Sequence, residues 1–226
     1  MRTDTANTTM IASLFAEAPL PTRCFIWLRW SLTPYRQIAS LLPGRGRVLD
    51  LGSGHGLLSL ALSMNPDRRE IIGIDHDPKR VRLAEGAAAR LESVSKPRFE
   101  VGDLEKGLAR FASGSLSGIA MIDILHYFAP DGQAALLHEA ARVLELGGIL
   151  AVREVDSEGG VAAVWNRFYE NVATRLRFTR SARRQLKFRS ADAWEKMLES
   201  AGFTVGSETC GPPIFSDVLF IARRTA

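Results

Sequence analysis

An apolar segment that runs directly into three glycines at alternate positions constrains the fold of this chain more than any other feature. A short apolar run is typical of a buried parallel strand, and glycines directly after it allow positive φ and close approach of a ligand to bare backbone. A helix beginning after the last glycine would present unpaired N–H groups to that ligand. The pattern predicts a cofactor-binding strand, loop and helix, although a glycine turn without a ligand looks the same locally. The segment reads Val48-Leu49-Asp50-Leu51-Gly52-Ser53-Gly54-His55-Gly56.

The glycine spacing separates this loop from two other phosphate-binding loops. A dinucleotide-binding loop has the pattern G-x-G-x-x-G, whereas the third glycine here, Gly56, comes one residue early and Leu57 takes its place. A P-loop requires Gly-Lys followed by Ser or Thr, and no such sequence follows Gly56. The spacing excludes a P-loop and disfavours a dinucleotide loop.

Length and cysteine content predict a single cytoplasmic domain. A chain of 226 residues fits one domain or one domain with an elaboration. Cys24 and Cys210 are the only cysteines, so neither a disulfide framework nor a zinc quartet is expected. We find no signal peptide and no run of about 18 apolar residues that would predict a membrane span. The four histidines lack a metal-ligand spacing such as H-E-x-x-H, so no metal is expected.

Strand-like and helix-like segments alternate after the glycine loop, which predicts a parallel sheet with helices on both faces. A final pair of strands is joined by Gly211-Pro212-Pro213, which is too short for a crossover helix, so these strands should be antiparallel. We expect Ser190 to cap the helix that precedes this pair. The expected helices include 78–91 and 130–145, and Gly147-Gly148 should end the second of them. Beyond the strand at Val48, the expected strands are 71–74, 98–102, 118–123, 149–155, 203–210 and 217–222.

The single domain divides into four regions along the chain. Residues 1–45 read as an N-terminal helical cap, 46–156 as the cofactor-binding core, 157–189 as a basic insert, and 190–226 as the last helix and the C-terminal hairpin. The stretch from Arg167 to Arg189 carries eight basic residues and one acid, although the whole chain has a net charge of only +4. The insert reads either as a solvated helical face or as a wall for an anionic acceptor.

Acidic residues follow every one of the five parallel strands. Because ligands of open α/β sheets bind outside the carboxyl ends of the strands, these acids should share one edge. The same positions suit acids that cap the following helices, and Asp77 before Pro78 reads as such a cap. The acids at the strand ends are Asp50, Asp75, Asp103, Asp123 and Glu154.

Four motifs, in matching order and spacing, resemble those of the class I methyltransferases that use S-adenosylmethionine. Val48 to Gly56 is similar to motif I, Ile71 to Asp75 to motif II, and Val101 to Leu104 to motif III. Ala141 to Gly148 is similar to the family's signature between a helix and the fifth strand. The resemblance implies an α/β fold with a doubly wound, seven-stranded, mostly parallel sheet, an antiparallel C-terminal strand, and S-adenosylmethionine as cofactor.

The sequence departs from the family pattern at two positions. Leu146 stands where proline is usual, and Ser53 stands where cysteine is common. Neither departure removes a binding function, so the resemblance still covers residues 45–155.

The resemblance also implies a cofactor-binding set. Gly52 and Gly54 would lie against the methionine end, and Asp50 would fix the loop and meet the ammonium group, directly or through water. Asp75 would accept both ribose hydroxyls, and Asp103 the adenine amino group. His76 would lie over the adenine, and the Leu104 N–H would lie near a ring nitrogen. Asp123 would touch the cofactor or cap the next helix. The full implied set is Asp50, Gly52, Ser53, Gly54, Gly56, Asp75, His76, Gly102, Asp103, Leu104 and Asp123.

The same edge supplies candidates for acid–base chemistry. Methyl transfer requires an aligned nucleophile and, for a hydroxyl acceptor, removal of a proton. His126 has the best unperturbed pKa for a base, and Glu154 is the second catalytic candidate, although His126 could equally be bonded within its loop. We expect a small-molecule acceptor, a hydroxyl of phenolic, lipid or polyketide type, possibly anionic or carrier-linked. Methylation of tRNA or rRNA and a non-catalytic cofactor-binding regulatory subunit are the alternatives, with nucleic acid disfavoured.

Overall fold

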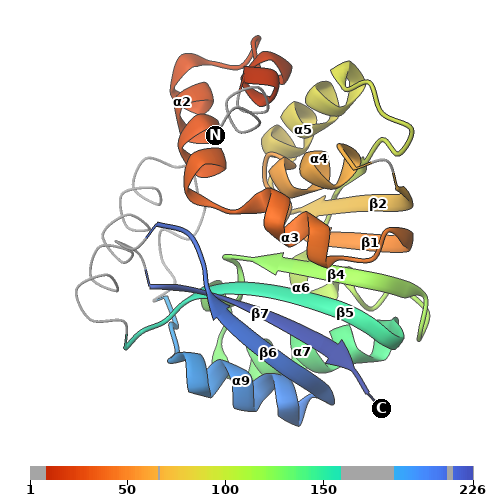
Figure 1. The fold of residues 1–226 in the computed structure, drawn as a ribbon, viewed down its shortest axis with the longest axis vertical. Helices are drawn as coiled ribbons and strands as arrows, with labels where there is room; N and C mark the ends of the chain where they lie inside the picture. Colours follow the sequence, from red (N-terminus) through yellow and green to blue (C-terminus); the bar gives the residue numbers. More distant parts are fainter. Residues whose placement is uncertain (1–8, 66, 159–185, 213–215, 226) are drawn as a thin grey trace.

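A seven-stranded sheet forms the centre of the molecule, with strand order β3-β2-β1-β4-β5-β7-β6 (Figure 1). The computed structural model describes residues 9–65, 67–158, 186–212 and 216–225. β7 pairs antiparallel with both β5 and β6, and the other pairs are parallel. This arrangement confirms the predicted fold class. The strands are β1 (Arg45–Leu51), β2 (Arg68–Asp75), β3 (Arg98–Val101), β4 (Leu116–Ile122), β5 (Leu144–Val155), β6 (Phe203–Thr209) and β7 (Asp217–Arg224).

Helices cover both faces of this sheet and divide its core in two. Side chains alternate along β1, so Val48 joins one cluster of buried apolar residues while Leu49 and Leu51 join the other. One face packs against α2 (Leu20–Leu32), α3 (Tyr35–Leu41), α4 (Leu57–Ser63) and α5 (Pro78–Arg90). The other face packs against α6 (Leu104–Gly107), α7 (Pro130–Val143) and α9 (Ala191–Ser200), with the 3-10 turn η1 (Leu125–Tyr127) after β4.

Two helices begin where their capping residues predict. Asp77 caps α5, because its carboxylate accepts a hydrogen bond from the Lys79 N–H at 2.9 Å. Ser190 caps α9, where its hydroxyl accepts from the Ala193 N–H at 3.4 Å. Both sequence predictions are confirmed.

The end of α7 differs from its prediction. The helix stops at Val143 and β5 begins at once with the buried Leu144, so Gly147 and Gly148 lie inside the strand instead of ending the helix. Gly147 has φ +76°, and the register between β4 and β5 shifts in this region. The two glycines therefore mark a strand irregularity, which reads in the sequence like a helix stop.

Helix α2 buries one of its two tryptophans and exposes the other. Trp30 is buried and stacks on Tyr35, but Trp27 on the same helix is 55% exposed. Most of the predicted basic insert, residues 159–185, lies outside the described residues, and the four-region division remains a prediction. Within the described ranges, no helix has the length and apolar character to cross a membrane.

Candidate cofactor and acceptor site

The carboxyl ends of the parallel strands meet at one edge of the sheet, where α2 lies (Figure 1). Two contacts join α2 to this edge: Arg29 binds the acid that follows β4, and Phe25 lies against the glycine loop. The predicted loop residues Gly52, Ser53 and Gly54 are partly exposed there. This edge is the candidate site.

Backbone hydrogen bonds to β2 fix the glycine loop. The N–H groups of Gly52 and Ser53 both donate to the Ile74 carbonyl, at 2.8 and 3.0 Å. Gly52 has φ +76°, and a Cβ there would lie 2.5 Å from Ile124 Cγ2, so both conformation and space require glycine. Gly54 also has positive φ, but a Cβ there would meet nothing within 4 Å. The backbone at Gly54 therefore borders open space that a ligand can fill.

The glycine at position 56 has a packing role. Its φ is +78°, and a Cβ there would lie 2.5 Å from Phe99 Cζ. Its N–H donates to the Ser53 carbonyl at 2.8 Å and closes the loop. Ser53 Oγ is buried and has no hydrogen-bond partner among the described residues.

Asp50 points away from the open loop and into the first turn of α4. Because Leu49 and Leu51 face the opposite side of the sheet, Asp50 faces α4, where its Oδ2 accepts from Ser59 Oγ at 2.7 Å and Ser59 N–H at 3.2 Å. Burial raises the pKa of Asp50 to about 6, against the lowering effect of the Ser59 hydrogen bonds. Asp50 therefore binds the first turn of α4, the helix that follows the glycine loop.

Asp75 ties the glycine loop to the end of β2. Its Oδ2 accepts from the Gly54 N–H at 2.9 Å, and its Oδ1 accepts from the Asp77 N–H at 2.8 Å. The neighbouring His76 is exposed, with its Nδ1 3.5 Å from Asp75 Oδ1. A carboxylate has about four acceptor sites, so these bonds aim Asp75 at the rim and leave acceptor capacity for hydroxyl donors.

Asp103 caps the short helix α6 after β3. Its Oδ1 accepts from the N–H groups of Glu105 and Lys106, at 2.8 and 3.4 Å. The residue itself is exposed, as is β3's last residue Val101, while Gly102 donates its N–H to the Asp75 carbonyl at 3.0 Å. Asp103 therefore caps α6 and is also exposed at the edge of the sheet, where the preceding residue contacts Asp75.

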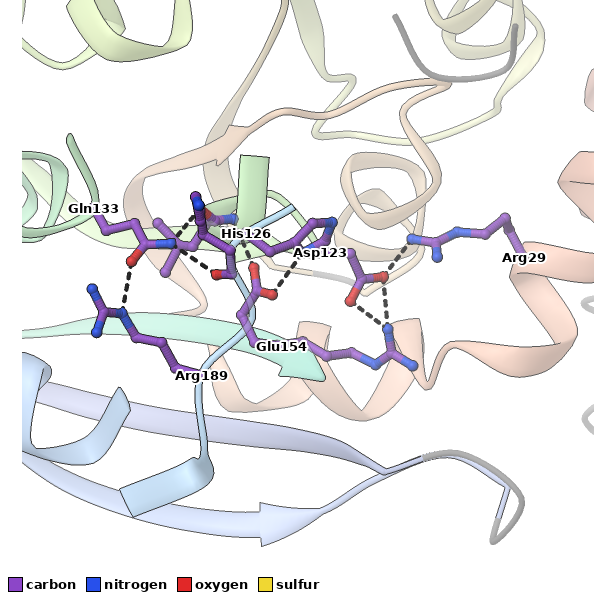
Figure 2. A network of polar contacts seen from close by, with 9 residues as sticks. Arg29, Asp123, His126, Gln133, Glu154 and Arg189 are labelled. Carbon is purple, nitrogen blue, oxygen red and sulfur yellow. Dashed lines mark hydrogen bonds and ion pairs between the residues drawn. The ribbon is translucent and has the colours of Figure 1, made fainter. Parts of the chain in front are cut away.

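Asp123 sits between two arginines (Figure 2). Arg29 Nη2 lies 2.6 Å from its Oδ2, and Arg153 Nη1 lies 2.5 Å from its Oδ1. Arg153 also binds Asp217, and its side chain is 4% exposed. Although burial works in the opposite direction, the positive charges of Arg153 and Arg29 hold the pKa of Asp123 below its usual value. Asp123 has φ +57°, and it does not cap the following turn, whose cap residue is Ile124.

His126 and Glu154 form a buried pair at the ends of β4 and β5. His126 Nδ1 lies 2.7 Å from Glu154 Oε2, and Glu154 Oε1 accepts from the Leu125 N–H at 2.7 Å. Both side chains are completely buried. The structure brings the two predicted catalytic residues together, and this hydrogen bond of the His126 ring goes to the end of β5 and not to its own loop.

The stretch Lys187–Arg189 packs against this pair, which the sequence alone did not reveal. The Lys187 N–H donates to the His126 carbonyl at 2.8 Å, and Phe188 stacks on the His126 ring with 4.9 Å between ring centroids. The buried Gln133 donates to the carbonyls of Leu125 and Lys187, both at 3.1 Å, and accepts from Arg189 Nε at 2.7 Å (Figure 2). Arg189, predicted to belong to the basic insert, is partly buried and binds Gln133.

A family model described as a methyltransferase domain matches residues 48–148, which span the glycine loop to the start of β5. Residues 48–148 thus form a methyltransferase domain of the class I, S-adenosylmethionine-dependent type. A search of curated proteins finds no match to the sequence. S-adenosylmethionine is its cofactor, and S-adenosylhomocysteine is the product that it releases.

Solved structures with low sequence identity to this chain share its fold. A methyltransferase from Methanosarcina mazei is 20% identical, with a TM-score of 0.65 over 86% of this chain and 99% of the other. An O-methyltransferase family protein from Burkholderia thailandensis is 18% identical, with a TM-score of 0.66 over 85% of this chain and 56% of the other. A methyltransferase in complex with the Trm112 activator from Haloferax volcanii is 18% identical, with a TM-score of 0.64 over 85% and 89%. These likenesses establish the fold.

The residues at this edge fit the cofactor. Gly54 borders space that a Cβ would not fill, and Asp75 and Asp103 bring acceptors to adjacent strand ends. We propose that the ribose hydroxyls bind Asp75, that the adenine binds near His76, Gly102, Asp103 and the Leu104 N–H, and that the methionine end lies along residues 52–54. Asp123, whose oxygens are held by arginines, would act on the cofactor through Arg29.

Proposed function

We propose that this methyltransferase acts on a hydroxyl group of a small-molecule acceptor, with His126 as general base and Glu154 as the residue that orients it. The observation that carries the proposal is the 2.7 Å contact between His126 Nδ1 and Glu154 Oε2 at the ends of β4 and β5. A histidine oriented by a carboxylate suits proton removal. A hydroxyl must lose its proton as it accepts a methyl group.

The bound cofactor supplies a methyl group on a positively charged sulfur, which needs no further activation. The two carboxylate oxygens of Glu154 accept hydrogen bonds from the Leu125 N–H and from His126 Nδ1. The neutral ring then keeps its lone pair on Nε2 for the acceptor's proton. Because the ring is completely buried, the acceptor has to displace some of its surroundings to reach it.

Two features support an aromatic or carrier-linked acceptor. Phe188 and Tyr127 stand against the His126 ring, with ring-centroid distances of 4.9 and 4.2 Å, so the base has apolar, aromatic neighbours. The sequence from 167 to 184 adds basic residues that suit a phosphate or another anion. The similar fold of an O-methyltransferase family protein agrees with a hydroxyl acceptor.

A turnover screen tests the proposal. Phenols, acyl-carrier-bound substrates and bulk tRNA are offered with S-adenosylmethionine, and release of S-adenosylhomocysteine is measured. We expect turnover with a hydroxyl compound and a loss of about 10²-fold or more in His126→Asn, with no loss in His138→Asn, which alters an exposed histidine on α7. Turnover with tRNA alone would favour the RNA alternative. Cofactor binding without turnover on any acceptor would favour a regulatory subunit.

We propose that the protein is cytoplasmic. Cys24 is exposed and Cys210 is buried, and both are free. Free thiols are typical of a reducing compartment. Localisation of a tagged chain by fractionation would test this, and recovery from an oxidising compartment would contradict it.

A further inference from the structure

The methionine end of the cofactor bears a negative charge, and the predicted binding residues include no positively charged side chain to bind it. This end bears an ammonium group and a carboxylate, next to the charged sulfur. The acids predicted to bind the cofactor suit the ammonium and the sulfonium, but they repel the carboxylate. A carboxylate enclosed by protein needs a charged or strongly polar donor. The acids in question are Asp50, Asp75, Asp103 and Asp123.

We propose that Arg29 binds the carboxylate of the cofactor. Arg29 comes from α2 and reaches the end of β4, where its Nη2 lies 2.6 Å from Asp123 Oδ2 (Figure 2). β4 is the direct neighbour of β1, whose glycine loop receives the methionine end. A guanidinium carries five N–H donors in a planar fork, so it can bind Asp123 and a second carboxylate together. The Arg29 side chain is 18% exposed, against 4% for Arg153.

A second contact places α2 over the glycine loop. The Phe25 ring lies 5.8 Å from the ring of His55, which stands between Gly54 and Gly56. Burial, together with the positive charges of Arg80 and Arg29, lowers the pKa of His55 to about 3. His55 is therefore neutral at physiological pH, and Arg29 brings the positive charge of α2 to this part of the loop.

Two other described arginines near this edge fit the role less well. Arg153 is enclosed between Asp123 and Asp217, and its side chain is 4% exposed. Arg80 lies on α5 beside Asp77, with 3.9 Å between its Nε and the carboxylate. That position follows β2, on the ribose side of the predicted cofactor. Asp123, pinned by Arg153, holds the Arg29 guanidinium in place.

A double-mutant cycle between protein and ligand tests this contact. Calorimetry would measure the affinity of the wild type and of Arg29→Met for S-adenosylhomocysteine and for its decarboxylated form, S-adenosyl-3-thiopropylamine, which keeps the adenosine, the sulfur and the amine. We expect the wild type to bind the decarboxylated ligand about tenfold or more weakly than S-adenosylhomocysteine. Arg29→Met should lose a similar factor for S-adenosylhomocysteine and bind the decarboxylated ligand as the wild type does.

The outcomes separate this role from a structural one. If Arg29→Met weakens both ligands equally, or neither, Arg29 does not bind the carboxylate. Arg29→Lys, which keeps the charge without the fork, provides a second test and should lose affinity only for S-adenosylhomocysteine, by a smaller factor than the methionine variant. Arg80→Met is the matched control and should change the affinities for the two ligands by the same factor. Because no acceptor is present, the result is independent of the roles proposed for His126 and Glu154.

Discussion

Replacing Glu154 with glutamine should disable the proposed base while leaving its packing almost unchanged. In the structure both carboxylate oxygens accept, one from the Leu125 N–H and one from His126 Nδ1, each at 2.7 Å. A glutamine amide has one accepting oxygen and one donating nitrogen. It cannot satisfy both neighbours in the same way.

The amide has two orientations, and one of them is clearly favoured. If its nitrogen faces the Leu125 N–H, two donors oppose each other in a completely buried place, which costs about 1–3 kcal/mol. If its oxygen faces that N–H, its nitrogen donates to His126 Nδ1. The ring proton then moves to Nε2, and the neutral ring can no longer accept a proton there.

The magnitude follows from the loss of general-base catalysis. Such catalysis contributes about 10²- to 10⁴-fold, so kcat of Glu154→Gln should fall by about that factor, or about 3–5 kcal/mol of transition-state stabilisation. The fold should lose only about 1 kcal/mol, because one hydrogen bond to a charged group becomes a bond between neutral groups. Affinity for S-adenosylhomocysteine should not change.

Three measurements check the argument. Initial rates report kcat, calorimetry reports cofactor affinity, and nitrogen NMR of the His126 ring reports which nitrogen carries the proton. Glu158→Gln, at an exposed position beyond β5, is the matched control and should behave as the wild type. The reasoning is refuted if the ring tautomer changes but the rate does not, or if the rate falls while the proton stays on Nδ1.

Three further predictions concern other parts of the structure. His55→Gln should flatten the pH dependence of stability. The pKa of His55 is lowered from 6.5 to about 3, so between these pH values the imidazole binds its proton in the unfolded chain only, and the wild type loses about 1.4 kcal/mol of unfolding free energy per pH unit as pH falls; the variant lacks this loss, so urea unfolding should show it gaining stability relative to the wild type by that amount. Arg153→Met should cost about 3–5 kcal/mol in the same assay at pH 7, because two buried carboxylates each lose an ion pair with Arg153; a loss under 1 kcal/mol would contradict this. Gly54→Ala should still fold, with a loss of about 1–2 kcal/mol from its positive φ, but should bind S-adenosylhomocysteine more weakly in calorimetry. Gly52→Ala should lower the melting temperature further, because its Cβ would clash with Ile124, and equal melting temperatures of the two variants would refute the distinction.

The strand ends and helix caps could be predicted because both depend on local sequence. A carboxylate before Pro78 and a hydroxyl before α9 predict helix starts, and Asp77 and Ser190 take these roles. The direction of the Asp50 side chain could also be predicted. Its apolar neighbours Leu49 and Leu51 share one face of β1, so Asp50 must face the other, toward α4.

The ion pairs at the site could not be predicted, because they join residues far apart in the sequence. Arg29 and Asp123 are 94 residues apart, and Arg153 and Asp217 are 64 apart. No local pattern marks Arg29 as the partner of a strand-end acid, since it reads as one polar position on an N-terminal helix. Likewise the packing of Phe188 on His126 depends on the chain returning to η1, 62 positions after it leaves.

Capping and ligand binding, treated as rival roles for the strand-end acids, are compatible in this structure. Asp75 uses one oxygen for the Gly54 N–H and the other for the Asp77 N–H, and each oxygen keeps a second acceptor site. The backbone bonds fix the direction of these sites, so they prepare the carboxylate for a ligand instead of occupying it. Asp50, in contrast, binds Ser59 twice through one oxygen and has a pKa raised by burial to about 6. The two acids flank the same glycine loop, and we infer that Asp75 binds the cofactor while Asp50 holds the loop that receives it.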